Sequence, residues 1–124
     1  MQGGDLRPMS DKRGVIELSD DNFDDVVFSN QDPVLVEFWS EGSYACRELD
    51  GVIERLAQEY TGKVRIGRLD VESSWQTAHQ FGVTNAPMVL VFQNQRVVDR
   101  IQGVQSATQY RQAINEVVVQ HWTI

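Results

Sequence analysis

The chain has 124 residues, 41% of them hydrophobic and 23% charged, which is the balance of a single globular domain with one core. Its 18 acidic and 11 basic residues give a net charge of −7, which disfavours nucleic acid and anionic membranes as partners, because phosphate groups are bound by clustered Lys and Arg. One cysteine excludes an internal disulfide, and no apolar run approaches the roughly 20 residues that cross a bilayer. We therefore expect a cytoplasmic protein with no signal peptide or membrane anchor.

Hydrophobic spacing predicts strands and helices that alternate along the chain. Val34–Trp39 is an almost unbroken apolar run, which is typical of a central strand covered on both faces. This order predicts an α/β fold with a mixed central sheet of about five strands flanked by about four helices. In chain order, we expect strand Val15–Leu18, helix Phe23–Val27, strand Val34–Trp39, helix Cys46–Tyr60, strand Val64–Asp70, a short helix from Ser73 or Ser74 to Phe81, strands Met88–Phe92 and Arg96–Ile101, and helix Ser106–Val119.

The same pattern divides the chain into three parts. Residues 1–14 are rich in Gly and charged side chains, and we expect them to form a flexible N-terminal tail. Residues 15–119 are expected to form the single domain. Residues 120–124 form an apolar C-terminal end, which predicts either helix packing or a docking surface for a partner.

Ser43-Tyr44-Ala45-Cys46 follows the central strand at the expected start of a helix. A dithiol exchange centre needs two sulfurs, one that attacks a disulfide and one that resolves the mixed disulfide that results. Here a serine oxygen takes the first position, and Cys46 is the only cysteine. Disulfide cycling within one molecule is therefore closed to this chain.

The order of elements resembles the thioredoxin family over residues 15–118. The motifs that carry the resemblance are Phe38-Trp39-Ser40-Glu41 ahead of Ser43-x-x-Cys46, and Ala86-Pro87 ahead of a strand. The resemblance implies a thioredoxin fold, a cis-proline at Pro87 and a final hairpin that ends near Gly103. Within this family, Phe-Trp-Ser-Glu followed by Ser-x-x-Cys is most similar to the chaperedoxins, which hold unfolding proteins, protect their cysteines and hand them to a chaperonin. The helical repeat region of the chaperedoxins is not present in these 124 residues.

Six residues depart from the thioredoxin pattern. Gly42 and Ser43 stand where a tryptophan and the first cysteine are usual, and Tyr44-Ala45 stands where a Gly-Pro is usual. Gly51 replaces a helix proline, and Glu37 replaces a buried aspartate. Such simultaneous changes indicate natural divergence, although an engineered replacement of a natural cysteine by Ser43 stays open.

Two interpretations of Cys46 stay open. It is either a buried small hydrophobic residue or a lone thiol that forms one mixed disulfide with a client or with glutathione. Because Gly42 and Ser43 are small, we expect them to leave the sulfur uncovered. Ser43 itself is expected to cap the helix. It has no neighbouring histidine in the sequence to make it a hydrolase nucleophile.

Glu37 lies within the apolar central strand, where an unpaired carboxylate is costly. The resemblance places Arg68 beside it on the neighbouring strand, so we expect a structural ion pair between Glu37 and Arg68. The alternative is a proton shuttle for Cys46, which is the role of the matching acid in thioredoxins.

The resemblance also implies a groove for extended chains. We expect Trp39 and Tyr44 to flank this groove, together with Ala86, Pro87 and Gly103. The backbone of Ala86 would be open to pair with a client by strand addition. No metal or cofactor is expected, since His79 and His121 lack ligand spacing.

We therefore expect a protein that binds extended or unfolded protein segments, as a holdase that protects client cysteines, and that is not an enzyme. The competing interpretation is a thiol-disulfide oxidoreductase, which either exchanges its single thiol with glutathione or has Ser43 in place of a natural cysteine. A third is a scaffold subunit recruited by a partner complex.

Overall fold

The computed structural model describes residues 14–29 and 31–122. The predicted elements all form, and their ends differ from the predicted ones by three residues at most. The predicted tail, apart from Gly14, and residues 123–124 of the C-terminal end lie outside the described residues. The elements are β1 (Val15–Leu18), α1 (Phe23–Val27), β2 (Val34–Trp39), α2 (Tyr44–Glu59), β3 (Arg65–Asp70), α3 (Trp75–Gln80), β4 (Met88–Gln93), β5 (Arg96–Gln102) and α4 (Ala107–Trp122).

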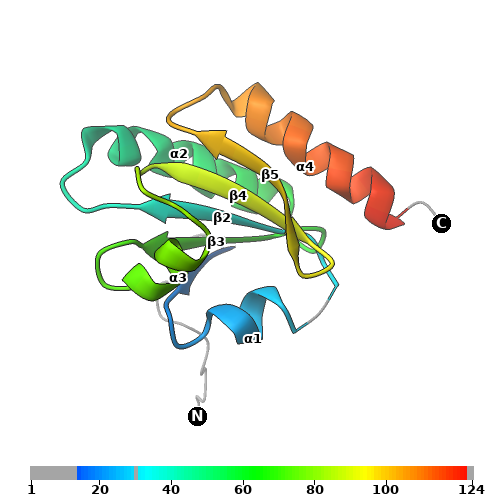
Figure 1. Ribbon diagram of the computed structural model, residues 1–124. Helices are drawn as coiled ribbons and strands as arrows, with labels where there is room; N and C mark the ends of the chain where they lie inside the picture. The colour runs from blue at the N-terminus through cyan, green and yellow to red at the C-terminus, as the bar shows by residue number, and fades with distance from the viewer. Residues whose placement is uncertain (1–13, 30, 123–124) are drawn as a thin grey trace, which may run out of the picture.

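The five strands form one mixed sheet in the order β1-β3-β2-β4-β5 (Figure 1). β1 and β2 run parallel to β3, whereas β4 is antiparallel to both β2 and β5. The apolar run of β2 therefore lies at the centre of the sheet, as predicted. With four helices around this sheet, the α/β fold class is confirmed.

β4 and β5 are joined by a two-residue turn that contains no glycine. Asn94 and Gln95 both adopt positive φ angles, 52° and 68°, as the type I′ form of a two-residue turn requires. The side-chain amide of Gln95 donates to the carbonyl of Phe28 at 2.9 Å, which ties the turn to the end of α1.

Helices cover both faces of the sheet (Figure 1). α2 and α4 pack on one face through a buried cluster that includes Leu35, Ile53 and Ile114. α1 and α3 pack on the other face. Side chains alternate along a strand, so Glu37 and Trp39 share the face of Leu35, beneath α2. The second cluster contains Phe23 and Phe92, whose rings lie with those of Phe28 and Phe81 at centroid distances from 5.2 to 6.4 Å.

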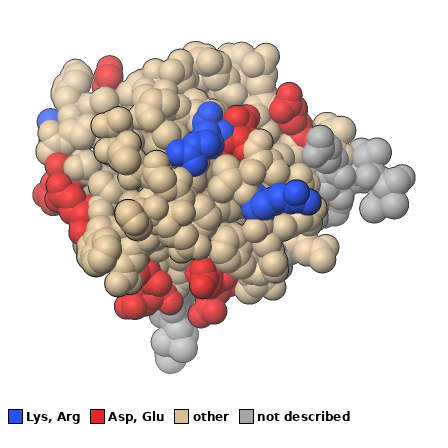
Figure 2. Space-filling model, in the orientation of Figure 1, with Lys and Arg blue, Asp and Glu red and all other residues tan. Residues whose placement is uncertain are grey.

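The face drawn in Figure 2 is mostly uncharged. Acidic side chains lie along its margins and also beside a basic side chain nearer the middle, and the basic side chains are separated from one another. No helix among the described residues is long and apolar enough to cross a membrane.

Candidate functional site

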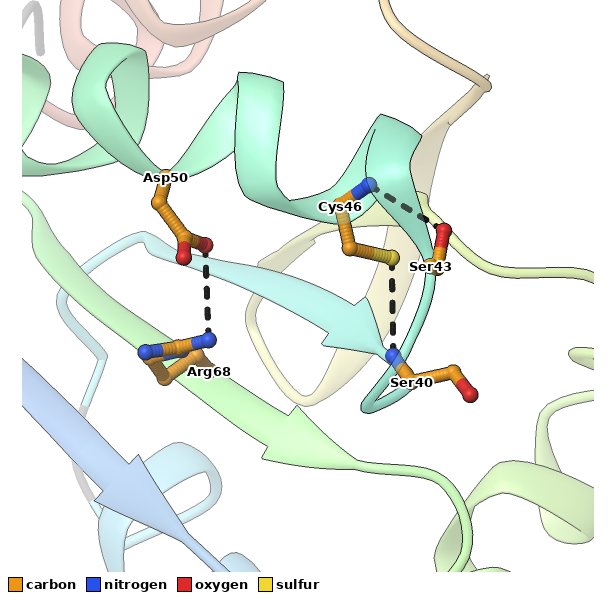
Figure 3. Close-up of polar contacts among 5 residues, drawn as sticks. All are labelled: Ser40, Ser43, Cys46, Asp50 and Arg68. Carbon is orange, nitrogen blue, oxygen red and sulfur yellow. Dashed lines mark hydrogen bonds and ion pairs between the residues drawn. The ribbon is translucent and has the colours of Figure 1, made fainter.

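Ser43 and Cys46 lie where β2 passes into α2 (Figure 3). Gly42 turns the chain with a φ of 87°, a conformation that glycine adopts without a steric cost. Ser43 is the N-cap of α2, and its Oγ accepts the backbone N–H of Cys46 at 3.2 Å. This confirms the predicted cap. The hydroxyl oxygen that stands in place of a sulfur is thus part of the helix start.

Cys46 is the third residue of α2 and is only 2% exposed. Its Sγ accepts the backbone N–H of Ser40 at 3.4 Å, so the sulfur points back toward the loop between β2 and α2 (Figure 3). The expectation that Gly42 and Ser43 would leave the sulfur uncovered is therefore wrong, because helical side chains lean toward the N-terminus and here meet the incoming loop. Cys46 does line a hollow of about 220 Å³, which we call the Cys46 hollow.

Glu37 is fully buried beneath α2, and neither of its carboxylate oxygens has a hydrogen-bond partner among the described residues. Burial, and then the negative charges of Asp50 and Glu17, raise the pKa of Glu37 from its ordinary 4.5 to about 8, while Arg68 acts in the opposite direction. Glu37 is therefore largely protonated at neutral pH. It lines a cavity of about 230 Å³, which we call the Glu37 cavity.

Arg68 pairs with Asp50, and the predicted Glu37–Arg68 ion pair is wrong. Strand register does place Arg68 opposite Glu37. However, its guanidinium lies over the Trp39 ring, 4.4 Å from the centroid. Its Nη2 lies 3.3 Å from Asp50 Oδ1, as Figure 3 shows. The Asp50 side chain is 35% exposed, so α2 supplies a solvated carboxylate as a competing partner for the guanidinium.

Asp50 is the site residue that sequence reasoning missed. It stands four residues after Cys46 on α2, and residues at that spacing share one face of a helix. This spacing was the available signal, because the face that carries Cys46 toward the sheet also carries Asp50 over β3.

The predicted groove residues are brought together only in part. Trp39 lines the Cys46 hollow, whereas Tyr44, Ala86 and Pro87 do not. Tyr44 is 71% exposed, and the guanidinium of Arg47 lies 6.0 Å from its ring centroid.

On the other side of the predicted groove, the Ala86–Pro87 peptide bond is cis. The carbonyl of Pro87 accepts the backbone N–H of Gly103 at 2.9 Å, which joins these two predicted residues. Neither the N–H nor the carbonyl of Ala86 has a hydrogen-bond partner within the described part of the chain.

The described residues assemble neither a group of metal ligands nor a hydrolase partner for Ser43. Among residues 14–29 and 31–122, no group of three or more His, Cys, Asp and Glu side chains could hold a metal ion. His79 is exposed on α3, and the side chain of His121 lies outside what the structure describes.

The fold is an α/β domain with a five-stranded mixed sheet. Its site has one buried thiol at the start of a helix and a buried acid beneath the same helix, which is the arrangement of a thiol-exchange protein that lacks its second sulfur. Comparisons with known proteins agree. The thioredoxin family model matches residues 14–116. The thioredoxin of Haemophilus influenzae is 33% identical over 102 residues, which cover 82% of this chain and 95% of that protein. The thioredoxin of Buchnera aphidicola subsp. Schizaphis graminum is also 33% identical over 102 residues, with 82% of this chain and 94% of that protein covered. Thioredoxin C-2 of Corynebacterium nephridii is 37% identical over 84 residues, 68% of this chain and 78% of that protein. The chain belongs to the thioredoxin family.

Proposed function

We propose that this chain is a thioredoxin-family protein without a dithiol cycle, which binds extended or unfolded protein segments and carries Cys46 as a lone thiol. The contact between Ser43 Oγ and the N–H of Cys46, at 3.2 Å, carries the proposal. An alcohol oxygen does not attack a disulfide at a useful rate, and it forms no disulfide with the one sulfur present. Such a site binds a client or holds one mixed disulfide, but it does not reduce a disulfide by itself.

Two features beside the thiol support a binding role. Tyr44 exposes 71% of its surface at the start of α2 and offers a rigid aromatic contact. The unpaired backbone of Ala86 offers hydrogen bonds to an extended chain, which is the basis of strand addition. Neither feature needs a thiol. The concrete form of the proposal is the activity that the chaperedoxin resemblance implies: holding unfolding clients in the cytoplasm and protecting their cysteines.

A second candidate is monothiol exchange, which is favoured by the position of Cys46 on the wall of a hollow. In that step the Cys46 thiolate attacks one sulfur of glutathione disulfide, a mixed disulfide forms, and one glutathione leaves as a thiolate that takes up the proton lost by Cys46. No second thiol in the chain resolves this adduct, so it persists until an external thiol arrives.

The test is light scattering from a client protein that aggregates on heating. The protein should suppress aggregation, Cys46→Ala should suppress it equally well, and Tyr44→Ala should suppress it less. Val119→Ala is the matched control, because Val119 is also strongly exposed but lies on α4.

The outcomes separate the three functions. Equal scattering with and without the protein contradicts the holdase proposal. A client effect that is lost in Cys46→Ala, together with a glutathione adduct seen by intact mass, favours monothiol exchange. Loss of the client effect in Val119→Ala, with Tyr44→Ala unchanged, favours a scaffold surface at the C-terminal helix.

A further inference from the structure

The Glu37 cavity and the Cys46 hollow share one wall. Trp39, Asp50 and Arg68 line both spaces. Arg68 contacts the other two, since its Nη2 lies 3.3 Å from Asp50 Oδ1 and its guanidinium lies 4.4 Å from the centroid of the Trp39 ring. We call these three side chains the partition. The buried acid lies on one side of the partition, and the lone thiol lies on the other.

Four buried polar atoms of residues that line the Glu37 cavity have no hydrogen-bond partner among the described residues. Both oxygens of Glu37, Nε1 of Trp39 and Nε of Arg68 are buried and make no hydrogen bond to any described residue. Two acceptors and two donors thus remain unused in one region. A guanidinium directly across the strand register would ordinarily turn to a buried carboxylate, because a buried acid is stabilised by a paired charge. Arg68 instead contacts Asp50 and Trp39, so a competing contact keeps its guanidinium away from the Glu37 carboxyl.

We propose that Asp50 is a positioning residue that holds the Arg68 guanidinium on the Trp39 ring and away from Glu37, so that the buried Glu37 carboxyl is left without an ion-pair partner behind the partition. The inference concerns the ion-pair partner of Arg68, and it does not depend on whether the protein binds clients. Without the Asp50 carboxylate, Arg68 turns to Glu37, the Glu37 carboxylate becomes the stable form, and the wall beside Cys46 opens.

Other charged groups also face Glu37, and the test must separate them from Asp50. Glu17 of β1 and Glu54 of α2 line the same cavity. Tyr110 of α4 is also coupled to Glu37. Burial is the main cause that raises the pKa of Tyr110, and the negative charge of Glu37 raises it further. The carboxylate of Asp50 acts on Glu37 directly as well, since its negative charge raises the pKa of Glu37 even if Arg68 stays in place.

A double-mutant cycle distinguishes positioning from simple charge. The titration midpoint of the Glu37 carboxyl is followed by carbon NMR in the full chain, in Asp50→Asn, in Arg68→Gln and in the double variant, with the signal assigned by its loss in Glu37→Gln. Asp50→Asn should lower the midpoint from about 8 by roughly 1 to 3 pH units, the range that an adjacent guanidinium produces. In the Arg68→Gln background the same change should lower the midpoint by less than half as much.

Equal effects of Asp50→Asn in the two backgrounds would overturn the proposal, because Asp50 would then act through its own charge alone. No effect in either background would overturn it too. Glu54→Gln is the matched control, since it removes an acid from the same cavity one helical turn from Asp50 and should leave the midpoint of Glu37 near its original value. Asp50→Ser repeats the cycle if Asp50→Asn disturbs the fold.

Discussion

The free energy of unfolding of the parent protein should fall as the pH rises, because Glu37 loses its proton. In Glu37→Gln this fall should be absent. The pKa of Glu37 is about 8 in the folded protein, against an ordinary value of 4.5, because burial disfavours the carboxylate. The folded state therefore holds this proton more tightly than the unfolded state. The resulting stabilisation is fully present below pH 4.5 and is lost as the pH rises through 8. Within that window the free energy of unfolding falls by about 1.4 kcal/mol per pH unit, or by about 4 kcal/mol between pH 5 and pH 9.

Urea unfolding at several pH values, followed by tryptophan fluorescence, measures this effect. The free energy of unfolding of Glu37→Gln, minus that of the parent protein, should increase by about 4 kcal/mol from pH 5 to pH 9. The difference between the two proteins removes the contribution of titrating groups that do not interact with Glu37. Glu54→Gln, which alters the same cavity, should show no comparable trend. A difference that stays constant over this range would refute the reasoning, because Glu37 would then titrate alike in the folded and unfolded states.

Two further predictions concern packing and the missing sulfur. Gly67→Ala should destabilise the protein by roughly 1–3 kcal/mol in urea unfolding, because the added Cβ would lie 2.7 Å from Leu18 Cδ1, whereas Gly51→Ala, with open space at its Cβ inside α2, should stabilise it by roughly 0.5–1 kcal/mol. The opposite order of the two variants would contradict the packing described for β3. Ser43→Cys should form an internal disulfide with Cys46 and reduce insulin, while the parent protein should not, as intact mass and a turbidity assay would show. A variant that keeps two free thiols in glutathione disulfide would show that the loop geometry does not allow closure.

Much of the fold was predictable because hydrophobic spacing determined it directly. The apolar run of β2 and the helical spacing of α2 are local patterns, and both elements form where they were expected. The hairpin between β4 and β5 was harder to predict, because Asn94 and Gln95 take positive φ angles that sequence reasoning assigns to glycine. In the folded chain, the Gln95 side chain of this turn donates a hydrogen bond to Phe28, 67 residues away in sequence, and local sequence gives no sign of such a distant contact.

The site was less predictable, since its decisive contacts depend on competition between partners. Sequence placed Arg68 beside Glu37 correctly in register, but the choice of Asp50 as its ion-pair partner depends on how α2 lies over β3. The burial of Cys46 likewise depends on Ser40, whose N–H meets the sulfur from the preceding loop. Residue size at positions 42 and 43 carried no information about that loop.

The most direct test of thiol-independent binding is an NMR titration with an unfolded client whose cysteines have been blocked by carboxymethylation. We expect the backbone amide signals of Trp39, Tyr44 and Ala86 to shift as the client is added, equally in the parent protein and in Cys46→Ala, while the signal of Val119 on α4 stays in place. Absence of shifts at these three residues, or shifts confined to α4, would contradict the binding function proposed for this site.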